Sequence, residues 1–171
     1  QMCIRDRLKG IEYFVLLMIG TVTYDGLRET TFWYEQFGSR INDMGFSTMM
    51  FVFMNLTTIL FYRFACFFAI KIGGSELELN KVSNLFGHTM LPIAFAYHVT
   101  HYLTLLLFES QTFFYRLNDP IGTGLNLFNA QEPSINYFVE PIVIWSIQVG
   151  VTLLGHMLSV VLAHDLSLIH I

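Results

Sequence analysis

Long runs of apolar residues constrain the fold of this chain more than any other feature of the sequence. They cover 44–72, 86–108 and 141–163, and a shorter run covers 11–23. About 20 helical residues cross a hydrocarbon core about 30 Å thick, because each residue adds about 1.5 Å. The apolar residues are continuous and do not alternate, which disfavours strands. The sequence therefore predicts an all-α fold, a polytopic transmembrane helical bundle with about four spans near these ranges.

The low content of charged residues excludes most alternatives to a membrane protein. Only 13% of the 171 residues are charged, about half the share that is usual for a soluble domain. A core helix of a soluble protein carries a polar face of Lys and Glu, and none of these runs has one. The net charge of -4 argues against binding of nucleic acid. The expected environment is the lipid bilayer.

Both ends of the chain are expected to be foreign to the native protein. Residues 1–7 (QMCIRDR) and 166–171 (LSLIHI) resemble translated sequencing-adapter tails, and such tails are excluded from reasoning about the fold. The native part then covers 8–165 and begins within a chain. We therefore expect a fragment whose partners include missing N-terminal spans of the same protein.

Positive charges near the ends of the spans give the expected orientation. The second connection, 73–84, has Lys71 and Lys81 close to the span ends, whereas the long third connection carries only Arg116 beside four acidic residues. Positively charged connections usually lie in the cytoplasm. We expect the second connection in the cytoplasm and the first and third outside.

Histidines are the main ionisable residues within the predicted spans. His88, His98 and His101 lie on the third span, and His156 and His164 on the fourth. Helix geometry places His98 and His156 near each other in depth, and likewise His88 and His164. Histidines within a bundle bind a metal ion or haem, shuttle protons, or form interhelical hydrogen bonds. No HExxH or CxxC motif is present, so these alternatives stay open.

Two carboxylates lie at the predicted outer boundary of the membrane. Asp25 follows the first span, and Glu109 lies two helical turns beyond His101. Asp25, His101 and Glu109 can therefore form an outer cluster that holds a metal ion or activates a water molecule. The alternative for Glu109 is a position in solvent among the lipid head groups.

The remaining polar residues of the spans have simpler interpretations. Arg63 is expected to extend its side chain to the inner interface. Asn55 and Gln148 are expected to form hydrogen bonds between helices. Pro92, in the second turn of its helix, predicts at most a mild kink.

Four stretches of the chain resemble a family of polytopic bacterial membrane proteins, some members of which are labelled fenitrothion hydrolase. The stretches are TVTYDG (21–26), HTMLPIAFAYHVTHY (88–102), NDPIGTGLNLF (118–128) and IWSIQVGVTLLGHMLSVVLAHD (144–165). The resemblance implies a longer protein in the bacterial inner (plasma) membrane. It maps Asp25, His88, His101, His156, His164 and Asp165 onto polar positions of the family, whereas an apolar residue stands at the position of His98.

Three functions follow as hypotheses. The first is an integral membrane protein that holds a metal ion or haem, with His88, His101, His156, His164 and Asp25 as the candidate metal ligands. The second is a proton-coupled transporter or permease subunit that relays protons through His and Asp. The third, implied only by the family label, is a membrane-bound organophosphate ester hydrolase, in which a metal-activated water attacks the ester.

Overall fold

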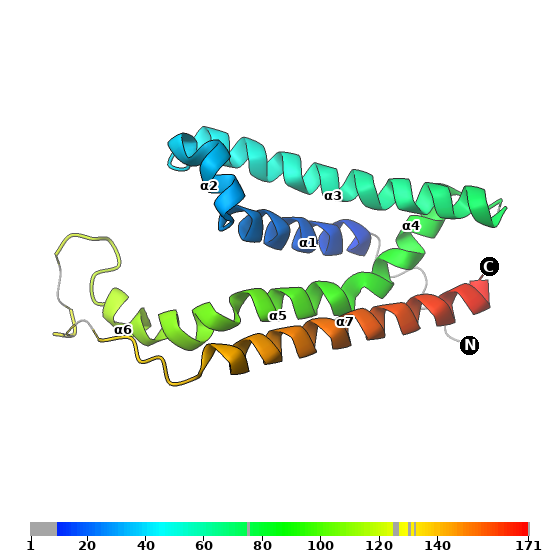
Figure 1. The fold of residues 1–171 in the computed structure, drawn as a ribbon. Coiled ribbons are helices and arrows are strands. Elements are labelled where there is room, and N and C mark those ends of the chain that lie inside the picture. Colours follow the sequence, from blue (N-terminus) through cyan, green and yellow to red (C-terminus); the bar gives the residue numbers. More distant parts are fainter. Residues whose placement is uncertain (1–9, 75, 125–126, 130, 132, 171) are drawn as a thin grey trace.

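Helices form all the regular secondary structure in the part of the chain that the structure describes. The computed structural model describes residues 10–74, 76–124, 127–129, 131 and 133–170 (Figure 1). The predicted tail 1–7 lies outside these residues. The helices are α1 (Ile11–Arg28), α2 (Thr31–Phe37), α3 (Met44–Gly73), α4 (Leu79–Gly87), α5 (Leu91–Phe108), α6 (Phe113–Arg116) and α7 (Pro141–His170), with 3-10 helices at Gly38–Arg40, His88–Met90 and Glu109–Thr112.

Three helical segments are long and apolar enough to cross a membrane. They are Met44–Gly73, Leu79–Thr112 and Pro141–Ser167, and each contains one of the three long runs of the sequence. The first predicted span is also helical, but α1 has only 18 residues, among them Glu12, Asp25 and Arg28. The all-α fold class is therefore confirmed, with three such segments among the described residues and a fourth, shorter helix between them.

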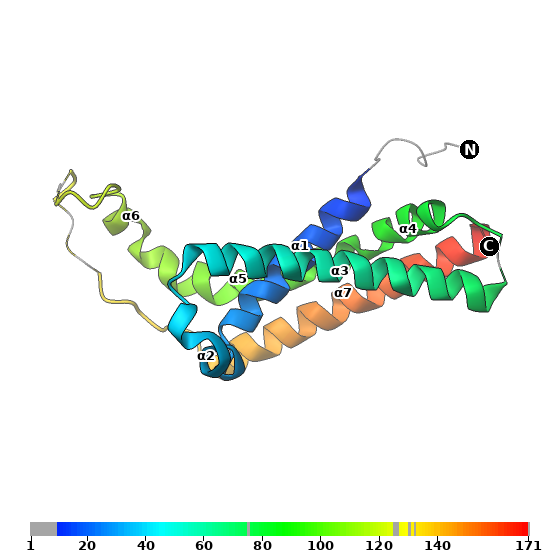
Figure 2. The ribbon, with the colours of Figure 1, turned by 90° about the horizontal axis from the view of Figure 1, so that it is seen from above.

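The central helix of the bundle is α1. The helices follow one another in space in the order α3, α1, α5 and α7, and contacts join each to the next (Figure 1). Consecutive long helices run in opposite directions along the chain, so α1 and α5 lie parallel as neighbours. Residues 29–43 and the described part of the connection 109–140 lie at one end of the bundle, and residues 76–78 lie at the other (Figure 2). We call these the α2 end and the α4 end.

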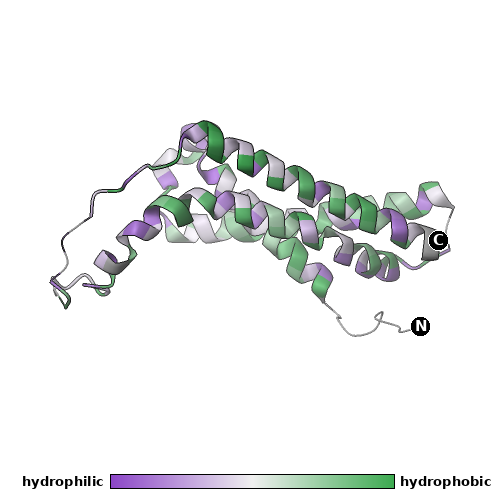
Figure 3. Cartoon of the chain, turned by 90° about the horizontal axis from the view of Figure 1, so that it is seen from below, coloured by the Kyte–Doolittle hydropathy of each residue, from purple (hydrophilic) through white to green (hydrophobic). Residues whose placement is uncertain are grey.

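The core of the bundle surrounds α1, whereas the outer helices expose apolar side chains. Val15, Leu16 and Val22 of α1 are buried against its neighbours. By contrast, large apolar side chains such as Phe61 and Leu154 are exposed on α3 and α7. Apolar residues recur along the whole length of these helices (Figure 3). Such extensive apolar surface matches a lipid environment better than water.

Glycines allow two of the helix pairs to pack closely. A Cβ atom on Gly20 of α1 would lie 2.6 Å from Asn55 Oδ1 of α3. A Cβ atom on Gly155 of α7 would lie 2.5 Å from the Cβ atom of Ala96 and 3.1 Å from the carbonyl oxygen of Pro92 on α5. Small residues are common where helices approach closely within membranes, because dispersion contacts between backbones stabilise the pair.

The segment around Pro92 divides the second candidate span into two helices. A 3-10 helix, His88–Met90, separates α4 from α5, and Pro92 stands in the first turn of α5. Proline is tolerated there because the N–H group it lacks has no partner within the helix. The next N–H group, that of Ile93, donates to Ser159 Oγ of α7 over 3.1 Å. The junction between α4 and α5 is thus fixed to α7.

Residues with suitable side chains mark both ends of α3. Asp43 caps its beginning, since the carboxylate accepts hydrogen bonds from the N–H groups of Gly45 and Phe46. The helix ends at Gly73, and Gly74 follows with φ of 62°, a left-handed conformation that glycine adopts at little cost. Thirty residues of helix span about 45 Å, so α3 is longer than a hydrocarbon core.

Candidate functional site

A carboxylate and an imidazole meet between α1 and α5, close to the α2 end. His101 Nε2 lies 3.1 Å from Asp25 Oδ2, and the hydroxyl of Tyr102 donates to the same oxygen over 3.2 Å. A carboxylate only accepts hydrogen bonds, so His101 carries a proton on Nε2. The side chains of Asp25 and His101 are 43% and 24% exposed, so this pair remains open to its surroundings. The structure thus brings together two of the five candidate metal ligands.

Glu109 does not lie beside Asp25 and His101. The hypothesis that these three residues form one cluster is therefore wrong for Glu109. Its carboxylate lies 3.2 Å from Arg116 Nη2, and both side chains are largely exposed. Glu109 opens the 3-10 helix that follows α5, and Arg116 closes α6. This matches the alternative in which Glu109 lies in solvent, where such pairs contribute little to stability.

Three further histidines bind the backbone of their own helices. The Nδ1 atoms of His88, His98 and His156 lie 2.8 to 2.9 Å from the carbonyl oxygen four residues earlier. A carbonyl oxygen only accepts, so in each case Nδ1 donates the proton. No hydrogen bond or ring contact joins His98 to His156 among the described residues, although their depths are similar.

The remaining predicted ligand, His164, lies near the end of α7. Its Nδ1 atom is 3.8 Å from Asp165 Oδ1, and both side chains are about two-thirds exposed. Within the described ranges, no group of three or more His, Cys, Asp or Glu side chains is placed to hold a metal ion. His88, His156 and His164 therefore do not join Asp25 and His101 in this structure.

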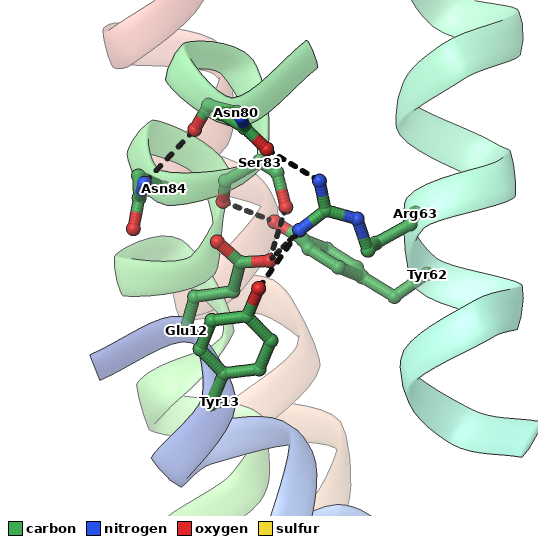
Figure 4. Close-up of polar contacts among 7 residues, drawn as sticks. All are labelled: Glu12, Tyr13, Tyr62, Arg63, Asn80, Ser83 and Asn84. Carbon is green, nitrogen blue, oxygen red and sulfur yellow. Dashed lines mark hydrogen bonds and ion pairs between the residues drawn. The ribbon is translucent and has the colours of Figure 1, made fainter. Parts of the chain in front are cut away.

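A second polar group lies between α1, α3 and α4, close to the α4 end (Figure 4). Glu12 of α1 is only 1% exposed, and its Oε1 atom lies 3.3 Å from Arg63 Nη1 of α3. Ser83 of α4, which is fully buried, donates its hydroxyl to the same oxygen over 2.5 Å. The carboxylate of Glu12 is thus bound by one residue of α3 and one residue of α4. We call Glu12, Arg63, Ser83, Tyr13 and Asn80 the Arg63 cluster.

Arg63 has further partners within this cluster. Its Nη1 atom donates to the hydroxyl of Tyr13 over 3.0 Å, and its Nη2 atom donates to Asn80 Oδ1 over 2.5 Å. Nearby, Tyr62 donates its hydroxyl to the carbonyl oxygen of Ser83 over 2.8 Å. The guanidinium group of Arg63 is therefore bound by residues of α1 and α4, partners that its interpretation as a side chain extended to the inner interface did not include.

Sequence reasoning missed the Arg63 cluster because Arg63 was considered alone and Glu12 was not considered. Glu12 is the only carboxylate in the apolar run 11–23, and Arg63 is the only arginine in the run 44–72. Charges are costly within a span unless they are paired. Two opposite charges in two separate spans were therefore a signal that the two residues contact each other.

The two amides of the spans have different partners. Gln148 of α7 donates to the carbonyl oxygen of Thr100 on α5 over 2.8 Å, so its predicted interhelical hydrogen bond is confirmed. Asn55 instead donates to the carbonyl oxygen of Phe51 on its own helix. Its Oδ1 atom is buried against Gly20 and has no hydrogen-bond partner among the residues that the structure describes. Asn55 therefore contacts α1 by packing, and its predicted bond between helices is wrong.

Comparison with known proteins gives no further assignment. No protein-family model matches the chain, and no curated protein or solved structure matches it either. The function is therefore argued from the two polar sites: the Asp25–His101 pair near the α2 end and the Arg63 cluster near the α4 end.

Proposed function

We propose that the chain belongs to a multi-pass protein of the bacterial inner membrane that moves a solute together with protons, as a transporter or a permease subunit. The observation that carries the proposal is the 3.1 Å contact between Asp25 and His101 across two neighbouring helices. The three membrane-length helices support the location in a membrane. The bacterial origin follows only from the resemblance of the four stretches to a bacterial family.

An imidazole beside a carboxylate is suited to proton exchange. Histidine is the side chain whose unperturbed pKa lies nearest to neutral pH. Asp25 lies 3.1 Å from His101 and can accept its N–H group, and the partial exposure of both side chains gives a proton access to the pair. Ionisable residues between spans commonly mark proton and substrate pathways.

The two other hypotheses have less support. A metal ion usually needs three or more protein ligands, and only Asp25 and His101 among the five candidates come together. Ester hydrolysis rests on the family label alone. The proton-coupled function requires only one proton-binding pair, and Asp25 and His101 can form it. We therefore prefer this function.

Proton movement in liposomes tests this proposal. The full chain is reconstituted with a pH-sensitive dye inside the liposomes, and an inward proton gradient is imposed with phosphate, succinate, alanine or glucose outside. We expect internal acidification that depends on at least one of these solutes. Asp25→Asn and His101→Gln should reduce it to the rate of protein-free liposomes, because each removes one partner of the proton-binding pair.

A matched variant on α7 controls for general damage to the protein. The ring of His156 is exposed, and within the described part of the chain its hydrogen bond goes to the backbone of its own helix, so His156→Gln should leave acidification unchanged. Acidification equal to that of protein-free liposomes with all four solutes would refute the proposal. Equal rates in wild type, Asp25→Asn and His101→Gln would refute the role of the pair.

A further inference from the structure

The Arg63 cluster is rich in hydrogen-bond donors that surround a single carboxylate. The guanidinium group of Arg63 and the hydroxyl group of Ser83 both donate to Glu12 Oε1, and the hydroxyl of Tyr13 accepts from Arg63 beside them (Figure 4). A planar guanidinium fork matches the geometry of carboxylates and phosphates. In this structure, the carboxylate in that position belongs to the protein itself.

We propose that the Arg63 cluster binds a small oxyanion, a carboxylate or phosphate, which replaces the carboxylate of Glu12 when Glu12 takes up a proton. This inference rests on the proposed function, since it names the class of solute that moves with the protons. The proton comes from solution and forms an O–H bond on the carboxylate of Glu12. The oxyanion then accepts the hydrogen bonds that Arg63 donated to Glu12.

The charge balance of the site is the physical reason for coupling the two events. Arg63 and ionised Glu12 together carry no net charge. An oxyanion bound beside an ionised Glu12 would leave one unpaired negative charge between the helices, which is unfavourable where little water solvates it. Protonation of Glu12 restores neutrality when the bound oxyanion carries a single negative charge, as dihydrogen phosphate and singly protonated succinate do. Anion binding and proton binding must therefore favour each other, and by the same factor.

The exposure of the cluster gives an oxyanion a route to Arg63. The side chain of Arg63 is 25% exposed, and those of Tyr13 and Asn80 are exposed as well. Glu12 and Ser83 lie behind them and are buried. An oxyanion therefore reaches the guanidinium group before it reaches the carboxylate that it displaces.

The other titratable groups described around Glu12 are not carboxylates, so Glu12 is the group that takes up the proton in this proposal. On α3, Tyr62 and Cys66 lie near enough to interact electrostatically with Glu12, in addition to Arg63. On α4, Lys81 is exposed, and in the following 3-10 helix the ring of His88 binds the carbonyl oxygen of Asn84. Gly87 of α4 packs directly on Glu12, because its Cβ atom would lie 3.0 Å from Glu12 Cα.

Calorimetric titration of the purified full chain with phosphate and with succinate tests the inference. Titration in buffers of different ionisation enthalpy counts the protons taken up. We expect wild type to bind at least one of the two anions with uptake of about one proton, so that affinity falls about tenfold per pH unit once Glu12 is ionised. Arg63→Gln should abolish binding.

Glu12→Gln is the decisive variant, because glutamine imitates a protonated glutamate in shape and charge. It should bind the anion without proton uptake and with an affinity that no longer depends on pH. Arg116→Gln removes an exposed arginine of another ion pair and should bind as wild type does. Tyr13→Phe removes the exposed hydroxyl that accepts from Arg63 and helps to hold its guanidinium group, so this variant should fold and bind the anion more weakly even if Glu12→Gln proves unstable.

Several results would overturn the inference, independently of the proposed function. Binding of neither anion by wild type, or equal affinity in wild type, Arg63→Gln and Tyr13→Phe, would refute the site. Unchanged proton uptake in a folded Glu12→Gln would refute the coupling. Anion binding without proton movement in liposomes would instead refute the proposed function and leave the site standing. Solute-dependent proton movement without anion binding would refute the anion site and leave the proposed function standing.

Discussion

The contact between α5 and α7 gives the sharpest prediction about how the bundle is held together. Both Gly150 and Gly155 lie on α7, but their surroundings differ. A Cβ atom on Gly150 would meet no atom within 4 Å, whereas one on Gly155 would lie 2.5 Å from the Cβ atom of Ala96. The variants Gly150→Ala and Gly155→Ala therefore add the same methyl group to an open and a closed position.

The expected magnitude follows from these distances. Carbon atoms in contact usually lie about 3.5–4.0 Å apart, so the methyl group on Gly155 overlaps its neighbour by at least about 1 Å. The atoms nearest to this methyl group also include the backbone of Pro92 and Ile93, which moves less readily than a side chain. Overpacking of this kind costs about 1–3 kcal/mol. Both variants gain the same helix propensity, about 1 kcal/mol, so that gain cancels in the comparison.

Reversible unfolding of the chain in bicelles measures the difference. We expect Gly155→Ala to be less stable than Gly150→Ala by about 1–3 kcal/mol. The hydrogen bond from the N–H group of Ile93 to Ser159 Oγ should weaken as well, because α7 must move away from α5. Equal stability of the two variants would show that α5 and α7 do not pack through Gly155, and it would refute the reasoning.

Three further perturbations have outcomes that follow from single contacts. Glu12→Ala should destabilise the chain by about 3 kcal/mol in the same unfolding assay, because it leaves the partly exposed Arg63 without its carboxylate partner. If the two residues form a pair, Glu12→Ala should cost less stability in the Arg63→Gln background than in wild type. Equal losses in the two backgrounds would exclude the pair. Tyr24→Phe should cost about 1 kcal/mol, since it removes the bond to the carbonyl oxygen of Ser47, and no loss in that assay would contradict the bond. The N–H groups of Thr123 and Gly124 bind the Asp119 carboxylate and hold its pKa below the usual range. The lowered pKa of Asp119 stabilises the folded loop at pH values above the pKa that Asp119 has in the unfolded chain. This stabilisation is lost as the pH falls through the lowered pKa. Amide chemical shifts of Thr123 and Gly124 should therefore change together in acid, and shifts that stay constant there would contradict this bond.

The continuous apolar runs predicted the long helices correctly, because length and composition alone decide whether a helix can cross a bilayer. The boundaries were less accurate. The polar segment 79–84 was assigned to a connection, but it forms most of α4. Its helix buries only Val82, Ser83 and Gly87 against the bundle, and so few buried residues leave a weak pattern in the sequence.

The proximity of Asp25 and His101 was predictable, because both residues lie near the same end of parallel helices. The sequence does not reveal which helices are neighbours, and this explains the other outcomes. Glu12 and Arg63 meet because α1 lies beside α3. His98 and His156 have similar depths, but depth says nothing about the direction in which a side chain points around its helix. Each of these two rings binds its own backbone.

The contact between Asp25 and His101 supports the proposed proton exchange most directly, and it can be measured in lipid bilayers. Solid-state NMR with ¹⁵N-labelled histidine and ¹³C-labelled aspartate reports dipolar couplings over such short distances. The account predicts a coupling between His101 Nε2 and the Asp25 carboxyl group that fits the observed 3.1 Å contact and disappears in His101→Gln. If wild type showed no such coupling, the two side chains would lie apart in the membrane, and the proposed proton site would be refuted.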